Sequence, residues 1–256
     1  MMHKVRQAYR HKLKRRLGLS KGEAPASAPP RVTLSGRVTH VPPSEGWPAL
    51  VSSYLGFDME ALEDKHRCLY MQKYVYPGSV IDGDVRLEGN VTSEDLRYAH
   101  SEDEHALDSG YVVILGDLYV DGCLEVVQEH DMFVAGSVHA RALISNSANT
   151  LVRDTLTIEE LVWLETSEEG GWLWAPVWQT PLMVRWVDQE GPDYRPDVPG
   201  RVVEAYAGQD TESEAISRIV EALSSSKERT VFRHVAKLAA DSQLSALAET
   251  IALHVG

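Results

Sequence analysis

A short strand–turn–strand unit recurs four times between about residues 79 and 165, and it limits the folds open to the chain. The shared pattern is Gly-Asp-apolar-x-apolar-x-Gly-x-apolar, which is clearest in residues 83–91 and 116–124. The third copy starts at Gly136, and the fourth starts at Asp154 and has lost both glycines. Successive copies therefore begin 33, 20 and 18 residues apart.

Apolar and polar residues alternate within each copy. Val85 and Leu87 fall on one face of an extended strand, and Arg86 and Glu88 fall on the other. The glycine permits the positive φ of a sharp corner, and the aspartate satisfies the turn through its own side chain. One unit cannot bury its apolar face alone, whereas stacked units build a continuous core. The repeat predicts a mainly β chain folded as a β-helix or β-solenoid. An antiparallel β-sandwich with similarly spaced strands is the alternative.

The repeat also resembles a known family. The Gly-Asp-Leu-x-Val-x-Gly unit of residues 116–122 is similar to the short rungs of bactofilin-like, polymer-forming β-helical proteins. The resemblance covers about residues 79–165 and concerns the architecture. It implies a short-rung β-helix and, as an expectation, self-assembly.

Three regions follow along the chain. Residues 1–30 form a basic leader and a flexible Pro/Ala-rich linker, residues 31–200 a solenoid-like domain, and residues 201–256 a helical C-terminal module. Residues 32–41 alternate and predict a single strand that opens the solenoid. In the last region a capping box at residues 211–214 begins one helix, residues 231–238 mark a second, and Asp241 begins a third.

The charge is distributed unevenly. Residues 1–21 hold eight Lys or Arg and no acid, so the remainder has 17 basic residues against 38 acidic ones, a formal −21. We expect the body to repel nucleic acid and anionic lipid, and the leader to attract both. Cys68 and Cys123 have no ligand-like spacing, which fits a reducing cytoplasm. No run of 18 apolar residues occurs, so we expect no membrane span.

An acidic insertion occupies residues 92–109 and accounts for the longest step between copies. We predict a surface loop there that binds a partner, with these candidate residues: Glu94, Asp95, Glu102, Asp103, Glu104 and Asp108. Together with His100 and His105 they resemble metal-ligand types, but their spacing matches no established site. We therefore predict no metal site and no cofactor.

Tryptophans cluster after the fourth copy. Trp172 and Trp174 would share one face of a strand, where their rings could stack on a sugar, a base or a protein partner. Large aromatic residues more often fill or cap a core, and here the helical module follows closely. We keep both residues as candidate partner-binding positions and leave the two interpretations open.

Clustered acids raise the question of catalysis. Right-handed β-helices include polysaccharide lyases and hydrolases, and five acids here occupy outward or corner positions: Asp82, Asp84, Glu88, Asp117 and Asp121. Corner aspartates are already explained by turn chemistry. The chain shows no Ser-His-Asp order, no Gly-rich phosphate loop and no His-Glu-x-x-His motif. We predict no catalytic residues.

These observations favour a non-enzymatic scaffold or protein-interaction module, with self-assembly as one form of it. The first alternative is an acidic neutraliser of a basic partner, such as an immunity protein for a nuclease toxin, because the body is strongly acidic. The second is a carbohydrate-active β-helix enzyme, which rests on fold analogy and the tryptophans.

Overall fold

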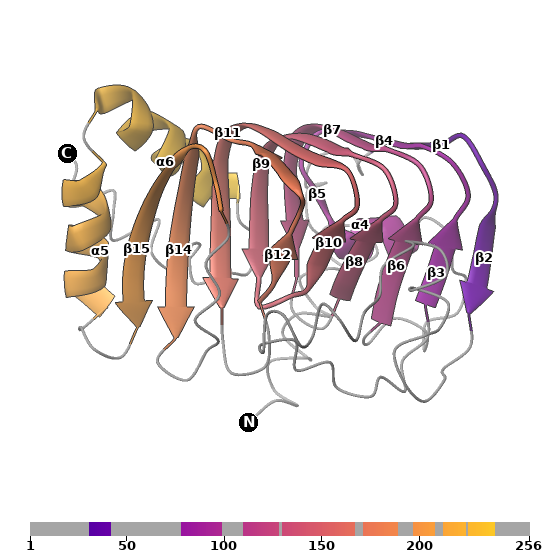
Figure 1. The fold of residues 1–256 in the computed structure, drawn as a ribbon, viewed down its shortest axis with the longest axis horizontal. Helices are drawn as coiled ribbons and strands as arrows, with labels where there is room; N and C mark the ends of the chain where they lie inside the picture. The colour runs from indigo at the N-terminus through magenta and orange to yellow at the C-terminus, as the bar shows by residue number, and fades with distance from the viewer. Residues whose placement is uncertain are drawn as a thin grey trace, which may run out of the picture. The chain divides into compact units, whose positions relative to one another are not determined.

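A computed structural model describes residues 31–41, 78–98, 110–127, 130–166, 171–188, 197–207, 212–223 and 225–238. All of them except Arg31 belong to one compact unit, Val32–Gly256. They form a mainly β chain folded as a β-solenoid of about four turns, with a few small helices, which confirms the predicted fold class (Figure 1).

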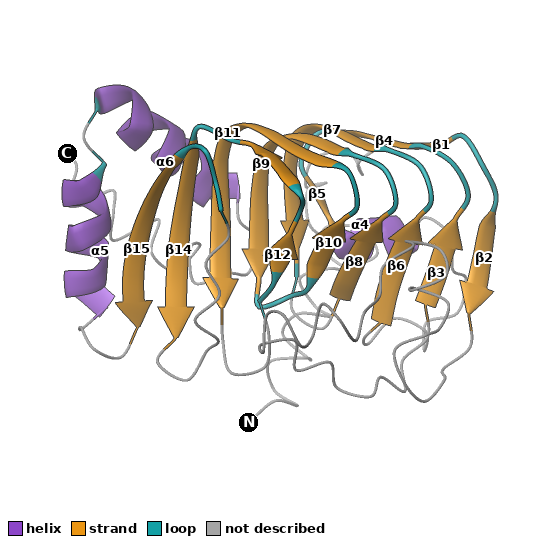
Figure 2. Cartoon of the chain, viewed as in Figure 1, coloured by secondary structure: helices purple, strands orange, loops and turns teal. Residues whose placement is uncertain are grey.

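Two sheets build the solenoid (Figure 2). In the described residues, sheet B has the order β12-β10-β8-β6-β3-β2. Its strands are β2 (Val38–Val41), β3 (Gly78–Ile81), β6 (Gly110–Ile114), β8 (His130–Val134), β10 (Thr150–Val152) and β12 (Leu173–Trp174).

Sheet A has the order β1-β4-β7-β9-β11-β14-β15, and in addition β5 pairs with β7 and β13 pairs with β11. Its strands are β1 (Arg31–Leu34), β4 (Val85–Glu88), β5 (Val91–Thr92), β7 (Leu118–Val126), β9 (Val138–Asn146), β11 (Thr155–Thr166), β13 (Val177–Gln179), β14 (Leu182–Asp188) and β15 (Arg201–Ala207).

From β3 and β4 onward, successive turns pair in parallel and in register, whereas β2 pairs with β3 antiparallel. Equivalent positions of the repeat copies therefore lie side by side in sheet A: Val85, Leu118, Val138, Leu156 and Trp178. An antiparallel sandwich does not produce this pairing, so the β-sandwich alternative is wrong for the described residues.

The corner aspartates join one turn to the next. Asp84 Oδ1 accepts a hydrogen bond from the Asp117 N–H (2.9 Å), and Asp117 Oδ1 accepts one from the Ser137 N–H (2.8 Å). The sequence predicted that each aspartate satisfies its own turn. The structure corrects this, because each carboxylate caps the backbone of the following turn.

The corner glycines have two different physical roles. Gly83 adopts a φ of 89°, as the sequence predicted for a corner glycine. Gly116 is not among the glycines with positive φ in the described residues. A Cβ at Gly116 would instead lie 2.5 Å from the Gly83 carbonyl carbon and 2.7 Å from the Asp84 nitrogen. Glycine is required there because successive corners stack in close contact.

Sheet A bends in the middle, which gives the solenoid a third wall. The register of β9 with both of its neighbours shifts at Arg141. In β7 the shift lies between Val120 and Cys123, and in β11 it lies between Ile158 and Leu161. We call β4, β13 and the parts of β7, β9 and β11 before the bend the first segment. The second segment comprises β5, β14, β15 and the parts after the bend.

The inward side chains of all three walls form one apolar core. In the second turn these include Ile114 from sheet B, Leu118 from the first segment and Leu124 from the second, all with no exposed surface. Burial of this kind stabilises by about 1.5–3 kcal/mol per large apolar side chain. The core is continuous from turn to turn, as the stacking argument predicted.

Two helices cover the outward side of the second segment. They are α5 (Glu212–Ala222) and α6 (Ser226–Leu238), and Figure 1 shows α5 alongside β15, on the side away from β14. Trp163 stacks against Trp186 with ring centroids 6.1 Å apart, and Phe232 of α6 lies 6.0 Å from Trp163. These rings anchor the helices to the sheet.

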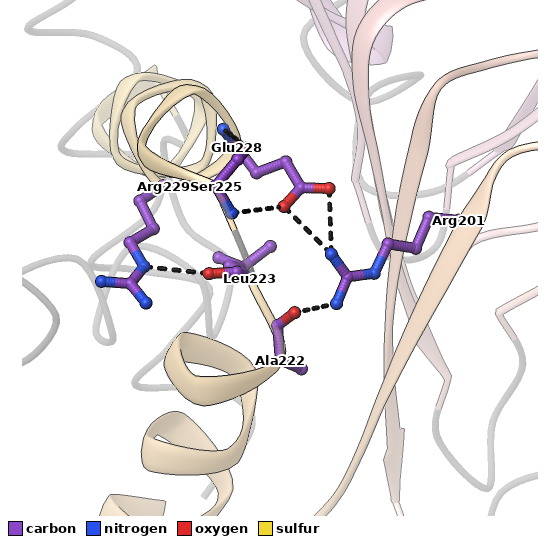
Figure 3. Close-up of polar contacts among 6 residues, drawn as sticks. All are labelled: Arg201, Ala222, Leu223, Ser225, Glu228 and Arg229. Carbon is purple, nitrogen blue, oxygen red and sulfur yellow. Dashed lines mark hydrogen bonds and ion pairs between the residues drawn. The ribbon is translucent and has the colours of Figure 1, made fainter.

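Arg201, the first residue of β15, ties the helices to sheet A (Figure 3). Its Nη1 lies 3.0 and 3.1 Å from the two carboxylate oxygens of Glu228, and its Nη2 donates to the Ala222 carbonyl at the end of α5. Glu228 also accepts a hydrogen bond from the Ser225 N–H (3.0 Å), while Ser225 Oγ accepts one from the Glu228 N–H (3.1 Å). Ser225 and Glu228 thus form a capping box that begins α6.

Several boundaries differ from those predicted. Residues 32–41 form two strands, β1 and β2, with a corner between them, because Gly36 packs against the backbone of Asp82. The tryptophan region forms a further partial turn, β12 to β14. Residues 201–207 form strand β15, so the predicted helical module starts with a strand.

The helix predictions are tested only in part. α5 and α6 lie where the first and second C-terminal helices were predicted, whereas Thr211 of the predicted capping box and the third helix at Asp241 lie outside the described residues. Residues 1–30 lie outside them too. No described helix has the length and apolar character needed to span a membrane.

Candidate interaction face

The three walls of the solenoid differ in what covers their outward sides. On sheet B the outward residues Val113, Phe133 and Leu151 are fully buried. On the second segment the outward residues are buried against α5 and α6. On the first segment they are exposed or half-buried in every strand: Arg86, Glu88, Tyr119, Asp121, His139, Arg141, Thr155, Thr157, Glu159, Val177 and Gln179. We call the outward side of the first segment, with the adjoining Asp84, Asp117 and Glu160, the polar face.

The polar face carries a stack of flat side chains from three successive turns. The Tyr119 and His139 rings lie nearly parallel, 9° apart, with centroids 5.1 Å apart. The guanidinium carbon of Arg86 lies over the Tyr119 ring, 4.6 Å from its centroid, which is a cation–π contact. The parallel register places the three side chains in one row, because Arg86 pairs with Tyr119 and Tyr119 with His139.

The same row continues across the last turns. Thr157 follows His139 in the register, and its hydroxyl donates to Gln179 Oε1 at 3.3 Å. At the bend, Arg141 Nε lies 3.1 Å from Glu160 Oε1. Rungs spaced at about 4.8 Å thus present an ordered, nearly flat row of polar and aromatic groups.

The face is acidic. It carries six carboxylates (Asp84, Glu88, Asp117, Asp121, Glu159 and Glu160) against the two guanidinium groups of Arg86 and Arg141, a formal −4 with His139 neutral. Such a surface attracts cationic groups at a range set by the Debye length, about 8 Å in physiological salt.

Asp117 links the stack to the corner ladder. Its Oδ2 accepts a hydrogen bond from the Tyr119 hydroxyl at 3.0 Å, while its Oδ1 binds the next turn. This hydrogen bond and the negative charge of Asp117 raise the pKa of Tyr119 above its ordinary value near 10. The hydrogen bond to Asp117 also fixes the position of the Tyr119 ring in the row.

Three of the five acids considered for catalysis are engaged in structural contacts. Asp84 and Asp117 cap the backbone of the next turn, and Asp121 accepts a hydrogen bond from the Gly89 N–H. The described residues contain no group of three or more His, Cys, Asp or Glu able to hold a metal ion. These carboxylates hold neighbouring turns together and fix the positions of the side chains beside them.

The structure places the first two acidic residues of the insertion inside the protein. Glu94 and Asp95 lie in the short helix α4 (Ser93–Tyr98) and are 7% and 6% exposed. Asp95 Oδ2 accepts hydrogen bonds from the Thr92 N–H (2.7 Å) and hydroxyl (3.0 Å), and Thr92 Oγ1 accepts one from the Asp95 N–H. The predicted surface loop therefore begins as a capped, buried helix, a correction that the Thr-x-x-Asp capping pattern explains.

The other candidate residues fall into two groups. Glu102, Asp103, Glu104 and Asp108 lie outside the described residues. Trp172 is 1% exposed, and Trp174 is half-buried and packs against the outward cluster of sheet B. The two tryptophans are not brought together with the acidic residues on one described surface.

A buried contact between Glu94 and His130 holds α4 against sheet B. Glu94 Oε1 lies 3.5 Å from His130 Nε2, and both side chains are at most 9% exposed. His130 begins β8, and Asp131 beside it accepts a hydrogen bond from the Asn149 N–H of the next turn (2.8 Å). Glu94 therefore contacts other residues of the protein interior and does not lie on the surface.

The alternation within each strand was visible in the sequence, but the polar face was not predicted as a site. The Arg86–Tyr119–His139 row forms because three successive turns pair in register. The three residues are separated by the same 33 and 20 residues as the repeat copies, so the repeat spacing could have revealed the row. Its exposure depends on which wall α5 and α6 cover, and no local pattern reports that.

The comparisons with known proteins add no assignment. No protein-family model matches the chain, and neither the curated proteins nor the solved structures searched gave a match.

Proposed function

We propose that this protein is a non-enzymatic protein-interaction module whose polar face binds a basic polypeptide partner. The observation that supports the proposal best is the combination of exposure, order and charge on one wall. In the described residues the other two outward sides are mostly buried, while this one presents a stacked row and a formal −4. A Lys- or Arg-rich segment lying across the turns would meet carboxylates on either side of the row.

The stack contributes rigidity to such a surface. Tyr119 is held by Asp117, His139 and Arg86, so little side-chain entropy remains to be lost on binding. Arginine side chains of a partner can stack on the exposed edges of such rings as well as pair with acids. The proposal is close to an acidic neutraliser of a basic protein, with the face rather than the acidic insertion as the contact.

The test is binding of a labelled Lys/Arg-rich peptide to the full chain, followed by fluorescence anisotropy. The charge reversal Glu159→Lys should weaken binding severalfold and flatten its salt dependence. Glu221→Lys, an exposed acid on α5, is the matched control and should change the affinity little. Equal weakening by Glu221→Lys would show that net charge alone, and not the polar face, governs binding.

Self-assembly through the solenoid ends is the second candidate, and the resemblance to bactofilin-like repeats suggests it. A strand added beyond β15 would meet α5, which packs against β15. This ranks self-assembly at that end below the polar face. Light scattering across concentration distinguishes the two, since assembly raises the mass with concentration and the proposed module keeps a constant mass.

A further inference from the structure

The last strands of sheet A enclose a charged side chain. Arg185 of β14 is 1% exposed, and the register places it between Leu164 of β11 and Glu204 of β15. Leu164 belongs to the solenoid core, so Arg185 lies at the C-terminal end of that core. A guanidinium that has left water needs acceptors for all its N–H groups.

One side of Arg185 is satisfied. Its Nη1 donates to Glu204 Oε1, and the Tyr206 hydroxyl donates to Glu204 Oε2 at 2.7 Å. Glu204 therefore uses one oxygen for each neighbour and balances the charge of Arg185. This pair explains how the buried charge of Arg185 is tolerated, but it involves only the Nη1 atom of the guanidinium group.

Within the described part of the chain, the other side of Arg185 has no hydrogen-bond acceptor. Both Nε and Nη2 are buried and make no hydrogen bond. These two nitrogens form the side edge of the guanidinium, whose parallel N–H groups match the two oxygens of a carboxylate. A buried donor left unpaired destabilises the protein, so an acceptor that fits the edge is favoured.

Solvent reaches this end of the core on β15. The side chain of Glu204 is 27% exposed, and Val202, which pairs with the core residue Met183, is 39% exposed. Strand β15 is the last in the order of sheet A, so no further described strand pairs beyond it. A small group could approach Arg185 past Glu204.

We propose that the Nε–Nη2 edge of Arg185 is a binding site for a carboxylate. The enclosed position selects a small group, either a free acid of the size of formate or a single carboxylate of a second copy of the chain. This site is separate from the polar face and does not depend on the proposed function.

The experiment is titration of the full chain with sodium formate, using sodium chloride at matched ionic strength as the reference and the melting temperature as the readout. Formate should raise the melting temperature saturably in the wild type. Arg185→Lys, which keeps the charge but loses the fork, should lose at least half of the shift. Arg153→Lys, an exposed arginine, should keep it.

A second variant tests whether a lost formate response merely reflects a misfolded protein. Arg185→Met with Glu204→Gln removes both charges of the pair and should fold but show no formate response. An undiminished response in this double variant would overturn the proposal, as would a wild type that formate stabilises no more than chloride does.

Light scattering with and without formate then identifies the source of the carboxylate. A mass that falls on adding formate indicates that a second copy occupies the site and is displaced. A constant mass, together with saturable stabilisation, indicates a free acid.

Discussion

At the scale of single residues, the contacts between turns explain why the repeat keeps its glycines and aspartates. Asp84 and Asp117 each bind the backbone of the following turn, and the glycine beside them stacks directly on the previous corner. The fourth copy lacks these glycines, yet Asp154 still donates its N–H to the Gly136 carbonyl at 3.2 Å. The backbone ladder therefore survives where the motif is lost.

Gly116→Ala should destabilise the fold by about 1–3 kcal/mol, because the added Cβ would press on the backbone of Gly83 and Asp84. Urea unfolding measures the change. Gly89→Ala is the informative comparison, since no atom lies within 4 Å of its Cβ and its cost comes from a φ of 86° alone, about 1–2 kcal/mol. Unchanged stability in Gly116→Ala would contradict the stacked-corner account.

Asp117→Asn should lower the pKa of Tyr119 toward its ordinary value, because the negative acceptor is removed while the amide oxygen can still bind the Ser137 N–H. A raised folded-state pKa means that the associated stability is present below pH 10 and is lost as the pH rises through the folded value. NMR titration of the tyrosine Cζ carbon measures it. If the pKa of Tyr119 in Asp117→Asn equals that of the wild type, a group other than Asp117 raises it.

Cys123 should be unreactive in the folded protein. Burial, followed by the charge of Glu125, raises the pKa of its thiol, so almost no thiolate forms at neutral pH. In a Cys68→Ser variant, where Cys123 is the remaining thiol, iodoacetamide should react only as fast as the protein unfolds. Rapid alkylation under native conditions would show that α5 and α6 leave this wall readily.

At the scale of elements, the α5–α6 pair is held by a small set of polar contacts over an aromatic layer. Arg201 binds Glu228 and the end of α5, and Arg229 Nε donates to the Leu223 carbonyl at 2.9 Å. These groups satisfy carbonyls and N–H groups that helix ends leave open. The pair keeps the second segment covered and leaves the first segment as the exposed wall.

Glu228→Ala should destabilise the α5–α6 pair by about 1–2 kcal/mol, because it removes the capping box and the contact with Arg201 together. Hydrogen exchange of the α6 amides is the measurement, and they should exchange roughly tenfold faster. Glu221→Ala, on the exposed side of α5, is the control and should leave exchange nearly unchanged. Equal acceleration in both variants would deny Glu228 a special role.

At the scale of the whole molecule, the sequence predicted the stacked turns because the repeat is local and periodic. It did not predict the bend of sheet A, since the shift beside Arg141 depends on the register of three strands. It misplaced Glu94 and Asp95 because acidic composition suggested solvent, whereas the capping contact with Thr92 buries them. The choice of exposed wall depends on helices about 100 residues away in sequence, which no pattern reports.

The most direct measurement of the central claim is an NMR map of backbone amide shifts during titration of the full chain with a Lys/Arg-rich peptide. The account predicts perturbations concentrated on β4, β7, β9 and β11 before the bend, around Arg86, Tyr119 and His139. It predicts small changes on α5 and α6. Perturbations centred on the helices, or spread evenly over the acidic residues of the chain, would contradict the assignment of the polar face as the binding surface.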